Sequence, residues 1–432
     1  MVTRRTRRDP EPSSPRVLII VQNLHVPFDR RVWLECQSLV AAGYDVTVVC
    51  PRGATSKKHE VIDGVEVHTY PPYAPGGRAA GFVVEYAYSF LATARLALGA
   101  RRRRGRFDVV QACNPPDVFW PLARWLRLRD GTRFVFDHHD LCPELYESRF
   151  PDGARLPLRG LLALERATFR TANRVTSTNE SYARVAVERG GKRPEHVTVV
   201  RTGPDPERLR RGPSDPALRR GREHLVAYLG VMGPQDGVDI ALAAADRVVN
   251  DLGRSDISFT LMGAGDSYDD LVVQRDALGL QDYVELPGRV PDEYVAAVLS
   301  TADVGLCPDP KNPLNDVSTM NKTMEYMAFG LPVVAFDLRE TRVSAQDAAV
   351  YVEPNRVEAY AQAVVDLLDR PELRAEMGRR GRERVEQELA WSHQCGGYVA
   401  VFDELTHRTG IPYRAGGSSD PDARYDEVRT GS

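Results

Sequence analysis

The stretch N-P-L-N-D-V-S-T-M-N-K-T-M-E-Y-M-A-F-G-L-P-V-V-A-F-D, residues 312–337, decides the fold of this 432-residue chain. Its central part is typical of a helix that ends at Gly330, and an apolar, strand-like run follows at 333–336. A second apolar run at 302–307 and a proline-rich loop at 308–313 precede the helix. The order strand, loop, helix and strand predicts one unit of an open, parallel α/β sheet.

The residues at the start of this helix suit a diphosphate attached to a ribose. Lys322 and Glu325 are three positions apart, so they share one face of the helix. A helix N-terminus attracts anions because its first amides have no backbone partner. We expect Lys322 to pair with the diphosphate and Glu325 to accept hydrogen bonds from two ribose hydroxyls. Ser318, Thr319 and Met320 precede the helix and would bring amides to the phosphate.

An ordinary capped helix with a solvated lysine and glutamate would show the same local pattern. Its placement favours a binding site, because open α/β sheets bind ligands beyond the carboxyl ends of their strands. Asp316 lies in the same loop, where we expect it to hold hydroxyls of a sugar.

Length and composition predict two globular domains. Apolar residues make up 42% of the chain and charged residues 27%, and the net charge of −3 does not favour binding to nucleic acid. No His/Cys group has metal-ligand spacing, so we expect no metal and no cofactor. The six cysteines are scattered and read as reduced thiols, and no signal peptide or membrane span is evident. These features favour a cytoplasmic protein.

Strand and helix patterns divide the chain into two α/β domains. We expect a disordered tail at 1–15, a first domain at 16–200, a linker at 201–222, a second domain at 223–391 and a disordered tail at 409–432. The expected strands are 17–22, 46–50, 65–70, 109–112, 134–137, 174–177, 197–200, 225–229, 258–262, 283–286, 304–307, 333–336 and 349–352, and the expected helices include 29–42, 356–369 and 371–388.

The block K-x-x-E-Y-M-A-x-G-x-P-V-V, which starts at Lys322, resembles the donor-binding block of retaining, nucleotide-sugar-dependent glycosyltransferases of family 4. Other similar blocks are D-R-R-V-W-L-E from Asp29, A-A-G-Y-D-V-T-V-V from Ala41, F-D-H-H-D from Phe136, A-N-R-V-T-S-T-N-E from Ala172, L-M-G-A-G-D from Leu261 and V-E-L-P-G-R-V-P from Val284. They occur in the family's order over roughly residues 17–405. The resemblance implies the GT-B fold, in which two Rossmann-like domains face each other and a C-terminal helix, here about 392–408, crosses back onto the first domain.

The resemblance also implies donor-binding residues in the second domain. Gly263 and Gly265 follow a strand and would allow the backbone to approach the ligand closely. Arg289 and Val290 stand where the family holds the edge of the nucleobase. A tight turn is the alternative explanation for each glycine.

In the first domain, the resemblance points to two more groups of residues. His138 and His139 follow a strand and have an aspartate on either side, and one of them, preferably His139, would contact the transferred sugar. Arg30 and Arg31 open the first long helix and would steady the leaving diphosphate. A solvated helix start is the alternative for the two arginines.

Two departures from the family pattern bear on the donor site. Most members carry G-R-L-x-x-x-K-G after the first strand of the second domain, whereas residues 230–237 read G-V-M-G-P-Q-D-G and contain neither cation. Most members also carry a glutamate eight positions before the ribose glutamate, and here that position is Val317. We expect Lys322 to replace the missing cations.

The resemblance implies a metal-independent hexosyltransferase that retains the anomeric configuration and needs no protein nucleophile. Its partners would be a nucleotide diphosphate sugar and a glycan, lipid-linked or small-molecule acceptor in cell-envelope or polysaccharide synthesis. A sugar-nucleotide 2-epimerase with the same fold is one alternative, but it would need acid/base carboxylates. A donor-binding scaffold without turnover is the other, and the missing cations favour it.

An aromatic and apolar stretch in the first domain runs into a basic cluster. The stretch contains Tyr70–Tyr73, Phe82, Val83, Tyr86, Tyr88, Phe90 and Leu91, and the cluster is 101–104 with Arg106. Apolar rings beside arginines suit the anionic inner face of a membrane and a lipid-linked acceptor. A buried helix whose last turn is capped by arginines is the alternative.

Overall fold

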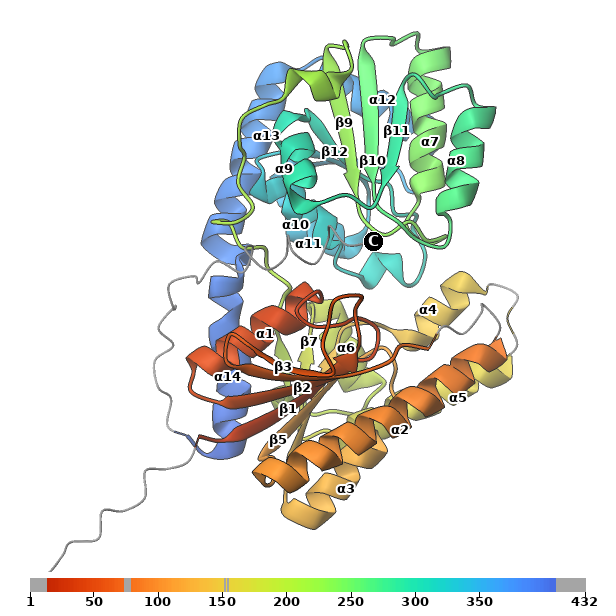
Figure 1. Ribbon diagram of the computed structural model, residues 1–432. Coiled ribbons are helices and arrows are strands. Elements are labelled where there is room, and N and C mark those ends of the chain that lie inside the picture. The colour runs from red at the N-terminus through yellow and green to blue at the C-terminus, as the bar shows by residue number, and fades with distance from the viewer. Residues whose placement is uncertain (1–13, 74–78, 151–152, 154, 409–432) are drawn as a thin grey trace, which may run out of the picture.

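The computed structural model describes residues 14–73, 79–150, 153 and 155–408. Most of the two expected tails lies outside these residues. Within them, two α/β domains face each other, and the last helix runs along the first domain (Figure 1). The GT-B fold expected from the sequence is confirmed.

The first domain is built on an eight-stranded sheet in the order β3-β4-β2-β1-β5-β6-β7-β8, in which only β3 is antiparallel. Its central strands are buried on both faces, which explains why they are apolar runs without alternation. The strands are β1 (Arg16–Ile20), β2 (Asp45–Pro51), β3 (His59–Ile62), β4 (Val65–Tyr70), β5 (Val109–Cys113), β6 (Arg133–His138), β7 (Arg174–Ser177) and β8 (Val197–Val199). The helices are α1 (Arg30–Ala41), α2 (Ala79–Arg104), α3 (Trp120–Asp130), α4 (Cys142–Arg149), α5 (Arg155–Thr171) and α6 (Glu180–Glu188).

The edge strand β3 is absent from the sequence expectations. It pairs with β4 through a two-residue turn at Asp63 and Gly64, whose φ angles are 46° and 84°. An Asp-Gly pair between two short strands is a common hairpin turn because both positions need positive φ. This signal was present in the sequence and predicts the hairpin.

The second domain carries a six-stranded, all-parallel sheet in the order β11-β10-β9-β12-β13-β14. The strands are β9 (His224–Leu229), β10 (Ile257–Met262), β11 (Val284–Gly288), β12 (Val304–Cys307), β13 (Val333–Phe336) and β14 (Ala349–Val352). The helices are α7 (Val238–Asp246), α8 (Tyr268–Ala277), α9 (Asp292–Thr301), α10 (Asn321–Ala328), α11 (Arg339–Ala345), α12 (Val357–Leu368) and α13 (Pro371–Arg384), and α14 (Trp391–Thr406) follows them and packs on the first domain. Short 3-10 turns occur at Pro194–His196, Pro216–Arg219, Asn315–Val317 and Gln346–Ala348, and π turns at Arg247–Asp251 and Val385–Leu389.

Tyr326 fixes helix α10 on the second sheet. Its buried hydroxyl donates to the carbonyl of Leu306 on β12 at 3.1 Å and accepts from the amide of Leu229 on β9 at 2.8 Å. Gly305 makes room for the ring, because a Cβ there would lie 2.6 Å from Cδ2 of Tyr326. Helix α10 is therefore held near the carboxyl ends of these two strands.

Helix α14 crosses back onto the first domain, as expected (Figure 1). The Tyr398 hydroxyl donates to Oε1 of Gln111 on β5 at 2.7 Å, and Nε1 of Trp391 donates to Oγ of Ser38 on α1 at 3.0 Å. The Tyr398 ring is fully buried in the core of the first domain. The end of the chain therefore completes the domain that the beginning of the chain started.

Candidate functional site

Lys322 lies at the start of α10 in a buried ion pair. Its Nζ donates to Oδ1 of Asp309 at 2.6 Å, and the side chain is 9% exposed. Burial alone would lower the pKa of Lys322, but the Asp309 carboxylate and the nearby Tyr228 raise this pKa well above its ordinary value. Lys322 therefore stays charged, although Asp309 offsets part of its charge.

The Lys322 side chain also lies beside the loop that lacks the usual cations. A Cβ on Gly230, directly after β9, would lie 3.1 Å from Cε of Lys322. The ammonium group therefore comes close to the position from which most members of the resembled family present an arginine. The expectation that Lys322 replaces that cation stays a prediction.

Glu325 faces the first domain across the space between the domains. Its Oε1 accepts from Nη1 of Arg30 at 3.2 Å, and Nη2 of Arg30 donates to Asp292 of α9 at 3.3 Å. Asp292 also pairs with Arg208 of the linker at 2.9 Å. Burial raises the pKa of the Glu325 carboxyl, the positive charge of Arg30 lowers it, and the net direction is upward.

The hydroxyls before α10 are engaged by helix α6 of the first domain. Oγ of Ser318 and the hydroxyl of Tyr182 are 2.9 Å apart, and Nδ2 of Asn179 donates to Oγ1 of Thr319 at 3.0 Å. Met320 packs against the core of the second domain. In this arrangement the Ser318 and Thr319 side chains join the domains, and their backbone is what remains for a ligand.

The loop before α10 contributes two more positions. Val317, where most members of the resembled family have a glutamate, packs against an apolar cluster of Leu141, Tyr182 and Leu314 that joins the two domains. Oδ1 of Asp316 accepts from the Arg339 amide at 3.1 Å and is 3.4 Å from Nζ of Lys311. The Asp316 carboxylate is thereby tied to its own domain.

Gly263 and Gly265 allow two loops of the second domain to touch. A Cβ on Gly263, whose φ is 152°, would lie 1.8 Å from the carbonyl oxygen of Gly230. A Cβ on Gly265 would lie 2.5 Å from the carbonyl oxygen of Met232. These contacts explain both glycines by backbone packing alone.

Arg289 contacts the first domain, whereas Val290 packs into its own domain. The Arg289 guanidinium lies 4.2 Å from the ring centre of Phe28, which stacks on His25 at 4.9 Å. Val290 is partly buried against the apolar core. The loop after β11 and the loop after β1 therefore meet at the same edge of the space between the domains.

The two histidines of the first domain have different surroundings. His138 is fully buried among Phe136, Phe169 and Tyr182, and neither ring nitrogen has a hydrogen-bond partner in the described part of the chain. Burial lowers the pKa of His138 to about 3. His139 is 13% exposed and bonds through Nε2 to Asp137. Only His139 has surface with which to contact a sugar.

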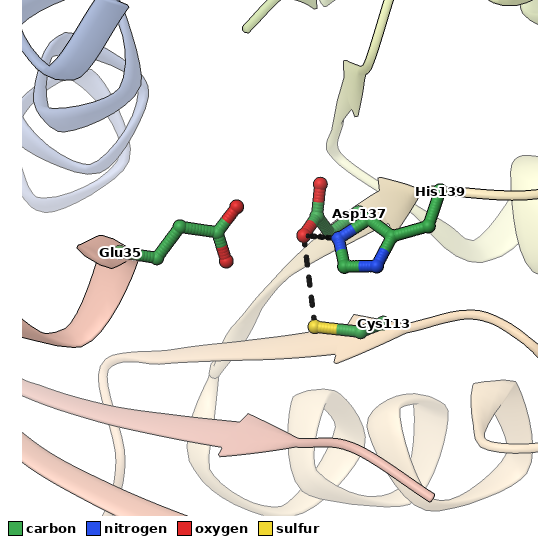
Figure 2. Close-up of side chains that lie close together, drawn as sticks. All are labelled: Glu35, Cys113, Asp137 and His139. Atoms are coloured by element: carbon green, nitrogen blue, oxygen red, sulfur yellow. Dashed lines mark hydrogen bonds and ion pairs between the residues drawn. The ribbon is translucent and has the colours of Figure 1, made fainter. Parts of the chain in front are cut away.

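Asp137 lies in a group of side chains that resembles a metal site. Figure 2 shows Asp137 and His139 beside Cys113, with Glu35 opposite them. The Arg31 guanidinium already supplies a cation here, since it lies 2.9 Å from Asp137, 3.1 Å from Glu35 and 2.9 Å from Nε2 of His139. A metal ion would have to displace or repel this charge, so the donor set does not fit one.

Arg31 is therefore a residue of the first domain's interior. It is 6% exposed, and its Nη1 donates to the Val200 carbonyl at 2.8 Å and to Oγ1 of Thr202 at 3.0 Å. Although burial opposes ionisation, Arg31 and His139 hold the pKa of Asp137 well below its usual range. Of the two arginines expected at the diphosphate, only Arg30 reaches across the space between the domains.

A polar cavity of about 200 Å³ opens in the first domain. It is lined by Gln22, Asn23, Leu24, His25, Pro51, Arg52, Tyr70, Pro72, Tyr73, Glu85 and Ser89. Nε2 of Gln22 donates to Oε1 of Glu85 on α2 at 2.7 Å. The cavity begins at the carboxyl end of β1, next to the loop that carries His25 and Phe28.

Helix α2 has features of both interpretations of its sequence, the membrane-facing surface and the buried helix capped by arginines. Arg101 pairs with Asp130, and Arg104 pairs with Glu66 and Asp45, so these two arginines anchor the helix to its own domain. Arg102 and Arg103 are exposed, and Val83 and Leu91 are 69% and 67% exposed. The Phe82 side chain lies outside the described residues. Nowhere in the described residues does a helix have the length and apolar character needed to cross a membrane.

The sequence did not lead us to predict several residues of the site. Asp309 lies two residues after the end of the buried strand β12, and an acid in that position is a usable signal for the partner of Lys322. Asp292, Arg208 and Asn179 carry no local signal, because their roles arise only where the two domains meet.

Comparisons with known proteins match two parts of the chain to glycosyltransferase family models. Residues 29–203 match the family model "Glycosyl transferase 4-like domain", and residues 223–370 match "Glycosyl transferases group 1". The chain is 27% identical over 254 residues to the 2-deoxystreptamine glucosyltransferase of Streptomyces kanamyceticus, covering 56% of this chain and 63% of that protein. The chain thus spans less than two thirds of this curated relative.

Solved structures show the same fold at low sequence identity. Sucrose-phosphate synthase from Thermosynechococcus elongatus superposes with a TM-score of 0.73 at 17% identity, over 91% of this chain and all of that one. Anabaena Alr3699/HepE in complex with UDP-glucose superposes with a TM-score of 0.67 at 14% identity, over 91% of this chain and 99% of that one.

The buried His138 predicts an acid-sensitive fold. His138 stays neutral in the folded chain down to about pH 3, whereas an unfolded histidine takes up a proton below about 6.5. Lowering the pH from 7 to 5 should therefore cost about 2 kcal/mol of stability through this residue. Urea unfolding measures this difference. Between pH 7 and pH 5, the free energy of unfolding of His138→Phe should fall by about 2 kcal/mol less than that of the wild type.

The exposed His393→Phe is the matched control and should keep the wild-type pH dependence. Asp117, whose pKa burial raises to about 7, acts in the opposite direction, but it is present in all three proteins. An identical pH dependence of wild type and His138→Phe would refute the assignment.

Proposed function

The chain contains a glycosyl transferase 4-like domain and a glycosyl transferases group 1 domain in the GT-B fold, and from this premise we propose that it is a retaining hexosyltransferase using a nucleoside diphosphate sugar. The observation that carries the proposal is the start of α10, where a charged Lys322 and a Glu325 directed at the first domain stand side by side. Amides, an ammonium group and a carboxylate in this order match a diphosphate followed by a ribose.

The donor would bind across the start of α10. Its diphosphate would contact the free amides and Lys322, and its ribose hydroxyls would donate to Glu325. The ribose would then replace Arg30 as a partner of Glu325. Arg30 would be redirected to the leaving diphosphate, so binding of the nucleotide and neutralisation of the phosphate would be linked.

The transfer needs no covalent step on the protein. The bond between the anomeric carbon and the diphosphate oxygen breaks, and the acceptor oxygen bonds to the same face of that carbon. The acceptor's proton passes to the departing diphosphate. The protein positions the reactants and stabilises the negative charge that develops on the phosphate, through Lys322, Arg30 and the helix amides. We propose that this stabilisation requires no metal.

His139 would contact the transferred sugar from the first domain. Its ring is held by Asp137, and Arg31 lies behind both residues. This support fixes the orientation of the imidazole. The alternative of direct contact through His138 has no support, because that ring is fully buried.

The acceptor would enter from the first domain. The polar cavity of about 200 Å³ beside His25 has the size and hydrogen-bonding character for one sugar-like or cyclitol-like ring. The relative from Streptomyces kanamyceticus is named a 2-deoxystreptamine glucosyltransferase. A glycan or lipid-linked acceptor in envelope or polysaccharide synthesis would present its terminal ring to the same cavity.

Three carboxylates around α10 are held in ion pairs, which disfavours them as the acid and base of an epimerase. Asp309 is paired with Lys322, Asp292 with Arg30 and Arg208, and Asp316 with Lys311. A 2-epimerase would need carboxylates able to exchange protons with the sugar. A scaffold would bind the donor without converting it.

Incubation with nucleotide sugars tests the proposal directly. HepE binds UDP-glucose in its structure, so UDP-glucose is the first donor to try, followed by GDP and ADP sugars. With cyclitol and sugar acceptors we expect released nucleoside diphosphate and a product whose anomeric configuration, read by NMR, equals that of the donor. A new sugar epimer would indicate the epimerase, and binding without conversion would indicate the scaffold.

The role of Glu325 predicts sensitivity to the ribose 2′-hydroxyl. For the nucleoside diphosphate that binds best, the wild type should bind the 2′-deoxy analogue about tenfold more weakly, because one hydrogen bond to a charged group is lost. Glu325→Gln should bind the parent nucleotide more weakly and discriminate less than about threefold between the two. Isothermal titration calorimetry measures all four affinities.

Glu293→Gln on the exposed surface of α9 is the matched control and should keep the tenfold discrimination. Equal discrimination by the wild type and Glu325→Gln would place the ribose elsewhere.

We also propose that α2 brings the first domain to an anionic membrane surface. Exposed Val83 and Leu91 would enter the interface, and Arg102 and Arg103 would meet the headgroups.

Each arginine near such a surface contributes about 1 kcal/mol to binding. The double variant Arg102→Gln with Arg103→Gln should therefore bind phosphatidylglycerol vesicles roughly thirtyfold more weakly, as measured by sedimentation. Arg247→Gln with Arg356→Gln, both exposed, is the control pair. Equal binding to phosphatidylcholine vesicles would exclude the electrostatic contact.

A further inference from the structure

A second groove, of about 580 Å³, lies on the donor domain away from the proposed nucleotide site. The linker forms one side, α13 the other, and the turn between α10 and β13 the base; Figure 1 shows the linker running beside α13. The residues that line the groove are Arg210, Arg211, Ala302, Asp303, Ala328, Phe329, Gly330, Leu331, Pro332, Pro371, Arg374, Ala375, Gly378, Arg379 and Arg382. Five of them are arginines and one is an acid.

Three of these arginines have no carboxylate partner in the described part of the chain. Arg211 donates to the carbonyls of Ser300 at 3.1 Å and Ala302 at 3.5 Å. Arg374 donates to the carbonyls of Leu367 and Leu368. Carbonyl groups orient a guanidinium but do not cancel its charge.

Arg210 is the least constrained of the three. It is exposed at the rim of the groove and makes no hydrogen bond or ion pair with any residue that the structure describes. Its guanidinium can therefore turn into the groove without breaking an existing contact.

The remaining charges of the lining are already balanced. Arg379 pairs with Glu376 and Glu383, and Arg382 pairs with Glu386. Asp303 pairs with Arg219 at 2.6 Å. The uncompensated charge of the groove is therefore positive and comes from Arg210, Arg211 and Arg374.

The base of the groove is apolar and closed. Phe329 and Leu331 are 2% and 1% exposed, and no lysine lines the groove. Planar guanidinium groups bind the oxygens of a phosphoryl group in pairs, and they are less strongly hydrated than ammonium groups. The volume is within the range of small-molecule sites.

We propose that this groove binds a phosphorylated small molecule of sugar-phosphate size. Arg210, Arg211 and Arg374 hold the phosphoryl group, and the remainder of the ligand lies on the apolar base. The site is separate from the proposed nucleotide site and does not depend on it, since no residue assigned to that nucleotide lines the groove.

Binding here would join the linker more firmly to the donor domain. Arg382 already fixes the linker by donating to the carbonyls of Leu209 at 2.7 Å and Pro206 at 2.9 Å. An anion held between Arg210 and Arg211 of the linker and Arg374 of α13 adds a second connection. Occupation of the groove should therefore slow tryptic cleavage after Arg210 and Arg211.

Titration calorimetry of the full chain with glucose 6-phosphate and with inorganic pyrophosphate tests the site. Arg210→Glu removes no contact within the described residues and reverses one charge, so it should fold normally and bind at least about tenfold more weakly. Arg247→Glu, an exposed arginine outside the groove, is the matched control and should bind as the wild type does. Lys322→Gln should leave the binding of glucose 6-phosphate intact, whereas pyrophosphate also resembles the diphosphate that the proposed function places at Lys322.

Each outcome decides the proposal. Loss in Arg210→Glu alone, with tryptic protection after Arg210 and Arg211 in the wild type, supports it. Unchanged binding by Arg210→Glu overturns it, as does loss of glucose 6-phosphate binding in a Lys322→Gln variant whose circular dichroism shows a native fold, which would put this probe at α10. If neither probe binds, sedimentation with phosphatidylglycerol vesicles decides whether the phosphoryl group belongs to a lipid: loss of binding in Arg210→Glu would support that source, and no loss would overturn the site.

Discussion

The buried ion pair between Lys322 and Asp309 is the interaction on which the candidate site depends. It joins the start of α10 to the loop after β12 and keeps a positive charge beside Gly230. Removing one partner of such a pair costs about 3–5 kcal/mol, because the other charge stays buried alone. The cation that would meet a phosphate is therefore held by the fold, and α10 cannot shift without breaking the pair.

The surface around α10 also holds the domains together. Ser318 and Thr319 meet Tyr182 and Asn179, and Arg30 reaches Glu325. The groups expected to bind a donor are thus partly the groups that join the domains. A nucleotide that competes with Arg30 for Glu325 would change the contact between the domains, which couples donor binding to domain position.

Much of the fold was predictable because parallel strands buried on both faces appear as continuous apolar runs. Strand β3 was not predicted, although the Asp63-Gly64 turn between β3 and β4 is a local signal for a hairpin. Arg31 and His138 could not be assigned from local sequence. Each is followed or preceded by a residue of the same type that reaches the space between the domains. Arg31 and His138 are buried, whereas their neighbours Arg30 and His139 are more exposed, and the sequence does not show this difference.

The sequence by itself determined the two α/β domains and the local pattern of Lys322 and Glu325, because these follow from periodicity and from spacing along one helix. The crossing helix was expected from the family resemblance. The tertiary structure alone decided which partners these side chains have. Arg30 at Glu325 and the arginines of the linker facing α13 come from segments distant in the chain, and Asp309 meets Lys322 across the loop between β12 and α10. Electrostatic interactions depend on distance in space and on burial, and neither can be read from order along the chain.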